Sequence, residues 1–170
     1  MIELRLVPLT EAHLPAVAAV AGEAQVARYT RFPVPIPPGW VEQWFQRYQA
    51  GRADGTREAF AAVSVADGRF LGLALAPGID EEAREMELGY LVDPSVRRQG
   101  VATELLRQLT DWALRERQAL RLTLMIDASN VGSIRAAERA GYRFEGTLRD
   151  AYVKPGIRAD TQLWSRLASD

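Results

Sequence analysis

A strand, a helix and a second strand follow one another between residues 86 and 126, and this succession restricts the fold more than any other feature. Apolar side chains alternate in the first strand, which ends at Asp93-Pro94, and in the second, at residues 120–126. Between the strands, Val101, Leu105 and Leu109 recur at helical spacing. A right-handed crossover joins two parallel strands in such a unit, so we expect a mixed sheet.

The rest of the chain predicts mainly antiparallel strands. Residues 28–39 hold four prolines, which exclude a regular helix or a central strand there. The acidic stretch 80–85 is a loop or the entry of a strand. We predict one α+β (mixed α/β) domain over residues 1–170, with these elements in order: strand 2–6, helices 11–20 and 39–50, strands 58–65, 70–76 and 86–92, helix 100–116, strand 120–126, helix 131–140, and strands 142–153 and 160–167.

Composition and charge limit the chemistry and the partners. The chain has 170 residues, no cysteine and one histidine, which excludes disulfides, thiolate metal sites and a cysteine nucleophile, and leaves no histidine-rich metal site. Its net charge of -1 is unlike that of a nucleic-acid-binding protein, and no apolar run is long enough to span a membrane. The N-terminal residues lack the apolar centre of a signal peptide, so we expect a cytoplasmic protein.

The start of the helix at 100–116 can bind an anion. The segment that opens this helix reads Arg97-Arg98-Gln99-Gly100-Val101-Ala102. The first N–H groups of a helix are unpaired and positively polarised, and small residues let an anion approach them closely. The segment is neither a Walker loop nor G-x-G-x-x-G. A pyrophosphate site and an ordinary strand–helix connection with two solvated arginines both remain open on these residues alone.

The same segment resembles the hallmark of the GNAT superfamily of N-acetyltransferases. That hallmark is Arg/Gln-x-x-Gly-x-Gly/Ala after a strand ending in Asp-Pro, matched by Arg97, Gly100 and Ala102 after Asp93-Pro94. The resemblance follows the element order over roughly residues 2–167. It implies the GNAT acyl-CoA N-acyltransferase fold, a mixed, mostly antiparallel sheet of about seven strands flanked by four helices.

A second motif strengthens the resemblance. Asn130 and Ser133 are followed by residues 140–146, which read AGYRFEG. This pattern is similar to the branch that contains the ribosomal-protein N-terminal acetyltransferases, which favours Asn-x-x-Ser followed by Gly-Tyr/Phe and Glu-Gly. Two separated motifs in the right order indicate the family more strongly than either motif alone.

The resemblance implies acetyl-CoA as co-substrate, without a metal. In the family, backbone amides of the loop hold the coenzyme A pyrophosphate, and the preceding strand pairs with the pantetheine arm. Asn130 suits the N-cap of the short helix, and the resemblance adds a contact with the pantetheine arm. The residues implied in coenzyme binding are Leu91, Val92, Arg97, Arg98, Gln99, Gly100, Val101, Ala102, Asn130 and Ser133.

Two side chains are candidates for the chemistry. Ser133 is the hydroxyl best placed by the resemblance to donate to the departing thiolate, and Tyr142 ranks below it as a core residue expected on a strand. Glu87 is placed near the acceptor channel, where it can take a proton from the amine through water. For Ser133 the alternative is a solvated serine in a capped helix, and for Glu87 it is an exposed strand face.

The acceptor is the least readable part of the sequence. The resemblance places Tyr29, Arg31, Phe32, Trp40 and Trp44 at its border, although an aromatic stripe at helical spacing is typical of a core, so we assign these residues no role. We expect an amine acceptor, which acidic residues at 80–85 can attract, and neither a nucleic-acid nor a membrane partner. A homodimer remains open. The alternatives to an N-acetyltransferase are a catalytically silent acyl-CoA sensor and a different mixed-sheet fold that binds another phosphate ligand.

Overall fold

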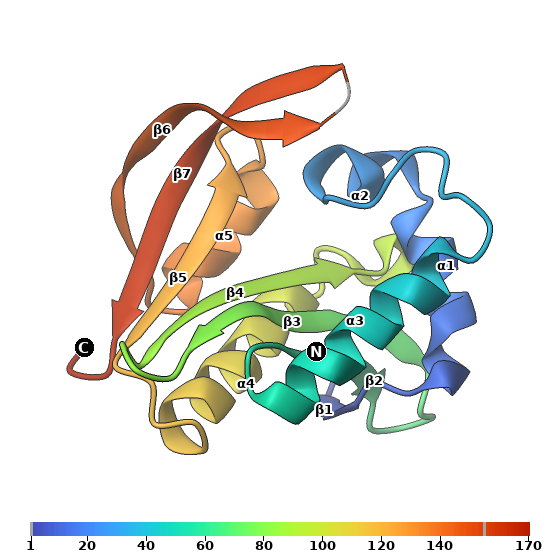
Figure 1. The fold of residues 1–170 in the computed structure, drawn as a ribbon, viewed down its shortest axis with the longest axis horizontal. Coiled ribbons are helices and arrows are strands. Elements are labelled where there is room, and N and C mark those ends of the chain that lie inside the picture. The colour runs from blue at the N-terminus through green and yellow to red at the C-terminus, as the bar shows by residue number, and fades with distance from the viewer. Residues whose placement is uncertain (1, 155) are drawn as a thin grey trace.

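Residues 2–154 and 156–170, which the computed structural model describes, form a seven-stranded sheet with the strand order β1-β2-β3-β4-β5-β7-β6 (Figure 1). The β4–β5 pair is parallel, whereas the other neighbouring pairs are antiparallel. The mixed sheet predicted from the strand–helix–strand unit is therefore confirmed. The strands are β1 (Leu4–Pro8), β2 (Glu58–Ser64), β3 (Phe70–Asp80), β4 (Glu85–Val92), β5 (Arg121–Asp127), β6 (Arg143–Lys154) and β7 (Ile157–Leu167).

Helices cover both faces of the sheet (Figure 1). On one face lie α1 (Leu14–Ala21) and α3 (Trp40–Asp54), and on the other lie α4 (Val101–Arg115) and α5 (Val131–Arg139). The remaining elements are the short helix α2 (Ala24–Tyr29) and two 3-10 turns, η1 (Glu11–His13) and η2 (Pro94–Val96). Four longer helices flank the sheet among the described residues, as predicted.

Each layer of helices has its own hydrophobic core. Leu105 and Leu109 of α4 pack with Leu88 and Val92 of β4, whereas Phe45 of α3 packs with residues of the opposite sheet face. Even-numbered residues of β4 therefore face α4 and α5, and odd-numbered residues face α3, because side chains alternate along a strand. This alternation assigns each β4 side chain to one side of the sheet.

Apart from shifts of a few residues at the ends of elements, the structure departs from the prediction at two places. The helix α2 was not predicted, and it ends at Tyr29, before the first of the four prolines. The strand β3 continues past its predicted end at residue 76 to Asp80. A shift of register between Leu75 and Gly78 leaves Pro77 at an irregular position, where the missing N–H does not interrupt the ladder.

None of the helices within the described residues is long and apolar enough to cross a membrane.

Candidate functional site

The two parallel strands at the centre of the sheet separate along their length. In the part of the chain that the structure describes, β4 and β5 pair only from Glu85↔Arg121 to Leu88↔Leu124. Beyond this point β4 stays with β3 as far as Val92, and β5 stays with β7 as far as Asp127. The strands diverge towards α2 and the β6–β7 hairpin (Figure 1). The result is an opening within the sheet, beside the carboxyl-terminal half of β4.

The backbone of β4 presents hydrogen-bonding groups to this opening. The amide of Asp93 donates to the carbonyl oxygen of Leu71 in β3 at 2.9 Å. Because the direction of the amides alternates along a strand, Leu91 faces β3 in the same way, and Tyr90 and Val92 face the opening. An extended chain could add to β4 here as a further strand. Leu91 and Val92 were the two residues predicted to pair with the pantetheine arm. Because the backbone groups of Val92 face the opening and those of Leu91 face β3, Val92 is the residue placed to form these hydrogen bonds.

The N-terminus of α4 offers free backbone donors close to the end of β4. Its N-cap, Gly100, adopts a left-handed conformation with φ 82°, and no side chain among the described residues caps it. The first amides of this 15-residue helix thus have no intrahelical acceptor and carry a partial positive charge. Val96 and Val101 are buried in the same core cluster as Val92, which fixes the loop to β4. An anion such as a pyrophosphate is the kind of ligand that these features suit.

The two arginines before this helix have different surroundings. The guanidinium of Arg97 donates to the side-chain oxygen of Gln25, so it joins the loop to α2. Arg98 is exposed, and its backbone has a positive φ of 59°. Gln99 donates to the carbonyl oxygen of Ser95 at 3.5 Å. The prediction that all three residues contribute to coenzyme binding stays a prediction, with Arg98 the freer of the two charges.

The first turn of α5 brings a hydroxyl to the opening. The side-chain oxygen of Asn130 accepts from the amide of Ser133 at 3.2 Å, which confirms the predicted N-cap. The side-chain NH2 of Asn130 makes no hydrogen bond within the residues that the structure describes. The hydroxyl oxygen of Ser133 lies 2.8 Å from the phenol oxygen of Tyr90. This contact links α5 to β4 just past the last β4–β5 pair.

Tyr90 is a residue that the sequence prediction missed. It shares a face of β4 with Met86 and Leu88, and the sequence offered no reason to assign it a role. Burial raises the pKa of its phenol to about 12, against a smaller lowering by the hydrogen bond with Ser133. Tyr90 is therefore neutral at physiological pH. Its position past the last β4–β5 pair, where β4 is paired only with the antiparallel strand β3, is visible only once the pairing is known.

Tyr142 is buried in the core, as predicted. It is 4% exposed, and its phenol oxygen lies 2.8 Å from the hydroxyl oxygen of Thr110 in α4. Burial raises its pKa to about 12. The expected place on a strand is wrong by one residue, because β6 begins at Arg143. A phenol held by α4 in the core is poorly suited to meet a ligand in the opening.

Glu87 lies on the other face of β4 from Tyr90. It is exposed and lines a depression with residues of β3, β4 and β5, among them Asp80, Glu85 and Thr123. Tyr48 of α3 has a pKa raised to about 12 by burial, and the charge of Glu87 contributes to this rise. Glu87 therefore acts on the α3 side of the sheet. The hypothesis that it accepts a proton stays untested by this geometry.

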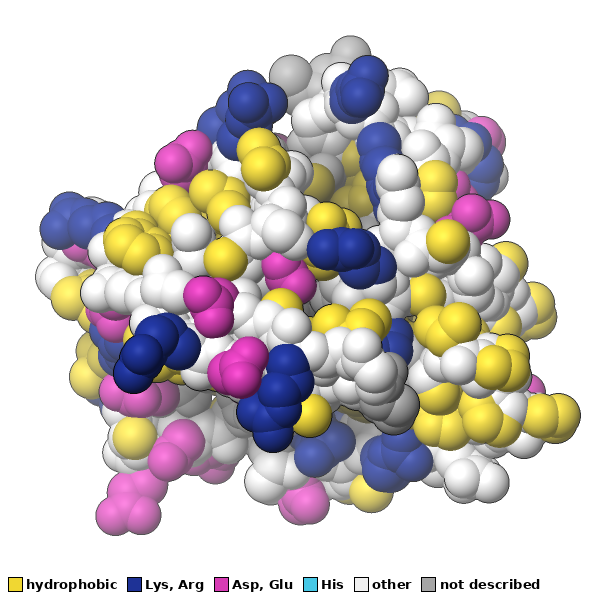
Figure 2. Space-filling view, turned by 90° about the horizontal axis from the view of Figure 1, so that it is seen from above, with side chains coloured by type: hydrophobic (Ala, Val, Ile, Leu, Met, Phe, Trp, Pro, Cys, Tyr) yellow, Lys and Arg dark blue, Asp and Glu magenta, His cyan; other side chains and the backbone are white. Residues whose placement is uncertain are grey.

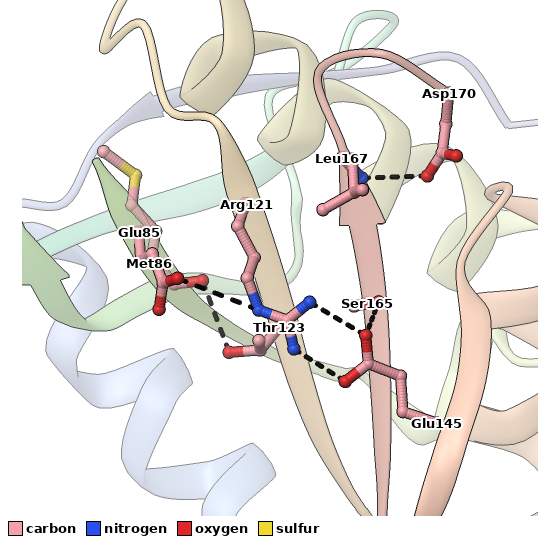
Figure 3. A network of polar contacts seen from close by, with 8 residues as sticks. All are labelled: Glu85, Met86, Arg121, Thr123, Glu145, Ser165, Leu167 and Asp170. Carbon is pink, nitrogen blue, oxygen red and sulfur yellow. Dashed lines mark hydrogen bonds and ion pairs between the residues drawn. The ribbon is translucent and has the colours of Figure 1, made fainter. Parts of the chain in front are cut away.

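A polar network crosses the sheet beside this depression (Figure 3). Arg121 donates to both carboxylate oxygens of Glu145, at 2.8 and 2.6 Å, and lies 3.9 Å from Glu85. Ser165 also donates to Glu145 at 2.5 Å. These bonds hold the pKa of Glu145 at about 2, with the bond from Arg121 the largest cause. The network joins β4, β5, β6 and β7 where the sheet is still continuous.

The far end of the opening is bounded by α2 and the β6–β7 hairpin. The phenol of Tyr152 donates to the carbonyl oxygen of Thr30 at 2.7 Å, and the ammonium of Lys154 donates to the carbonyl oxygens of Ala27 and Thr30. Arg28 donates weakly to Ser129, at 3.5 Å, just after β5. These contacts connect α2, β5 and β6, which are remote in sequence, around one end of the opening.

The aromatic residues near the predicted acceptor site belong mostly to a core. Phe32 and Trp44 are buried, with ring centroids 5.5 Å apart, and the ring of Trp40 packs at a tilt against Phe32, with centroids 5.2 Å apart. Tyr29 is half-buried and Arg31 is exposed. Viewed from above, Lys and Arg side chains are spread among apolar and acidic ones rather than gathered in a patch (Figure 2). Among the described residues, no three His, Asp or Glu side chains are grouped to hold a metal ion.

Comparison with protein families gives one match over most of the chain. The model of the acetyltransferase (GNAT) domain matches residues 3–143. Among curated proteins, the probable N-acetyltransferase YjcK of Bacillus subtilis is 29% identical over 112 residues, which are 65% of this chain and 62% of that protein. The putative ribosomal N-acetyltransferase YdaF of the same organism is 28% identical over 101 residues, 59% of this chain and 55% of that protein. The match thus spans less than two thirds of either relative.

Solved structures share the fold at low sequence identity. RimL, a ribosomal L7/L12 alpha-N-protein acetyltransferase in complex with coenzyme A, superposes with a TM-score of 0.89 at 19% identity, over 98% of this chain and 96% of that chain. A spermidine N-acetyltransferase from Vibrio cholerae, in complex with CoA and spermine, gives 0.85 at 19% identity with the same coverage.

Proposed function

The chain belongs to the GNAT acetyltransferase family, and from this premise we propose that it transfers an acetyl group from acetyl-CoA to a primary amine. The observation that carries the proposal is the opening between β4 and β5 beside the N-terminus of α4. One end of this arrangement can bind the pyrophosphate, and the strand edge can hold the arm that carries the thioester. The amine attacks directly in a ternary complex, without an acetylated protein side chain.

Backbone groups do most of the coenzyme binding in this proposal. The amides of Gly100, Val101 and Ala102 bind the pyrophosphate, with Arg98 and Arg97 near its charge. The extended pantetheine arm pairs with β4 at Val92, next to Leu91, as an added strand would. Gln99 lies between the arginines and the helix and contributes its backbone amide to the pyrophosphate site. The free amide group of Asn130 donates to a carbonyl of the arm.

The reaction forms a C–N bond and breaks a C–S bond. The nitrogen lone pair of the neutral amine attacks the thioester carbonyl carbon, and the sulfur leaves as a thiolate. Ser133 donates a hydrogen bond to this thiolate. After release, the thiolate takes up a proton from water. Because an amine with a pKa near 10 is mostly protonated at pH 7, it must first lose a proton, which Glu87 accepts through water.

The acceptor is a primary amine of a protein N-terminus or of a small molecule. Of the two solved structures named above, one is described as a ribosomal-protein acetyltransferase and the other as a spermidine acetyltransferase. Asp80, Glu85 and Glu87 give the α3 side of β4 an acidic surface, which would attract a cationic amine. A cytoplasmic location and a homodimer stay predictions.

The test is release of free coenzyme A thiol from acetyl-CoA in the presence of peptides with free N-termini and a series of polyamines. We expect turnover with at least one class of amine. Ser133→Ala should lower kcat by about tenfold or more, since a hydrogen bond to a charged group is worth roughly 1.5–3 kcal/mol. The matched control is Ser169→Ala, at an exposed serine near the C-terminus. Binding of acetyl-CoA without turnover across the panel would instead support a catalytically silent sensor.

A further inference from the structure

Two phenols of the protein, the half-buried Tyr90 and the buried Tyr142, each lie 2.8 Å from an aliphatic hydroxyl, but in different places. The Tyr142–Thr110 pair lies within the core between α4 and the end of α5. The Tyr90–Ser133 pair lies where β4 and β5 stop pairing, at the start of the opening. The same chemical contact therefore occurs once as a core interaction and once beside the proposed path of the thioester.

The direction of the Tyr90–Ser133 hydrogen bond determines what Ser133 can do. Each hydroxyl has a single hydrogen, and the contact uses one of the two. If Ser133 donates to Tyr90, its hydrogen is no longer available to a ligand. If Tyr90 donates to Ser133, the serine hydrogen stays free to donate to another acceptor. The role proposed for Ser133 therefore requires that Tyr90 be the donor.

We propose that Tyr90 is a positioning residue for acetyl transfer, whose phenol donates to the hydroxyl oxygen of Ser133 and thereby directs the serine hydrogen towards the departing sulfur. This inference rests on the proposed function. Ser133 cannot turn freely, because Asn130 holds its amide and Tyr90 holds its oxygen. The bond to Cβ and the hydrogen bond from Tyr90 then leave only two directions around the hydroxyl oxygen for the serine hydrogen.

Tyr90 keeps its proton throughout the reaction. Its pKa, raised to about 12 by burial, lies well above that of a thiol, which is about 8.5. Transfer of the phenol proton through Ser133 to the thiolate would therefore be uphill. As the C–S bond breaks, the sulfur gains a hydrogen bond from Ser133, and its proton comes from water after release. The amine loses one proton to Glu87 through water before it attacks and a second proton to water once the C–N bond has formed, and the thiolate takes up one proton, so that charge and atoms balance.

The test compares Tyr90→Phe with Tyr142→Phe, each of which removes one phenol oxygen from a hydroxyl partner. We expect Tyr90→Phe to lower kcat by about tenfold, the effect of losing one hydrogen bond, with KM for acetyl-CoA changed less than about threefold. Tyr142→Phe should leave kcat within about twofold. In the double variant Tyr90→Phe/Ser133→Ala, the tyrosine change should add nothing to the serine change, because both act through one contact.

A second readout needs no acceptor. A hydrogen bond to the sulfur lowers the pKa of the thiol of bound coenzyme A, which can be followed by the ultraviolet absorption of the thiolate. This pKa should rise in both Tyr90→Phe and Ser133→Ala and stay unchanged in Tyr142→Phe. An unchanged kcat and thiol pKa in Tyr90→Phe, or losses that multiply in the double variant, would overturn the inference. If the wild-type protein shows no turnover, but the thiol pKa of bound coenzyme A is higher in Tyr90→Phe than in the wild type, the positioning role is supported and the proposed function is rejected.

Discussion

Replacement of Gly72 by alanine tests whether the geometry of β4 at the opening depends on a close approach of β3. Gly72 lies opposite Val92 in the β3–β4 ladder. A Cβ atom built at this position would overlap the carbonyl oxygen of Leu91 and come within 3.2 Å of Leu105 and 3.3 Å of Val92. The first and last of these neighbours are backbone atoms of β4, which cannot rotate away as a flexible side chain could.

The expected loss of stability follows from two opposing terms. Overpacking of a tight interior costs about 1–3 kcal/mol. Alanine also restricts the unfolded chain, which returns about 0.4–1 kcal/mol. The net loss is roughly 1–2 kcal/mol, and for a domain of this length each kcal/mol lowers Tm by about 2–4 °C. We therefore expect Tm to fall by about 2–8 °C, with weaker binding of acetyl-CoA because β4 is displaced at its open edge.

The assay is thermal unfolding of Gly72→Ala beside Gly89→Ala, followed by circular dichroism. Gly89 lies on β4 itself, but a Cβ there meets no atom within 4 Å. Gly89→Ala should therefore be as stable as the wild type or slightly more so, because only the unfolded-chain term remains. Equal stability of the two variants would refute the argument, since it would mean that β3 and β4 can separate without loss.

Two further predictions concern the anion site and the polar network. Gly100→Glu should abolish acetyl-CoA binding measured by calorimetry. Gly68→Glu, at another glycine with positive φ, should bind acetyl-CoA normally. Near wild-type affinity in Gly100→Glu would show that the pyrophosphate does not bind at the N-terminus of α4. The pKa of Glu145 is lowered by folding from 4.5 to about 2, so its stabilising effect is present above pH 4.5 and disappears as the pH falls towards 2. The difference in Tm between wild type and Glu145→Gln should shrink over that range, and a difference independent of pH would contradict the assignment.

The order of elements could be predicted because local periodicity determines most of it. Strict alternation at residues 120–126 and helical spacing at 100–116 identified the parallel pair, and the motifs around Gly100 and Ser133 identified the family. The structural likeness to other acetyltransferases excludes the alternative of a different mixed-sheet fold. These features depend on residues close together in the sequence, which is why they were visible without coordinates.

The features that escaped prediction depend on contacts between distant residues. The helix α2 is short, and its carbonyl oxygens at the C-terminal end are bound by Tyr152 and Lys154 from β6. Another partner of α2 is Arg97, which donates to Gln25, a contact that the sequence did not predict. The role of Tyr90 depends on where β4 leaves β5. In each case, a residue far away in the chain supplies the interaction that local sequence patterns cannot reveal.

A single strand, β4, separates the two halves of the proposed chemistry. Its even-numbered side chains face α4 and α5, so Tyr90 meets Ser133 there, and its odd-numbered side chains face α3, so Glu87 lies on the other side. A thioester held in the opening would thus have its sulfur near the hydroxyl pair, and an amine could approach its carbonyl carbon from the acidic face. Because a slip of one residue would exchange the two faces, the register of β3 on β4, including the close contact at Gly72, determines where both groups lie.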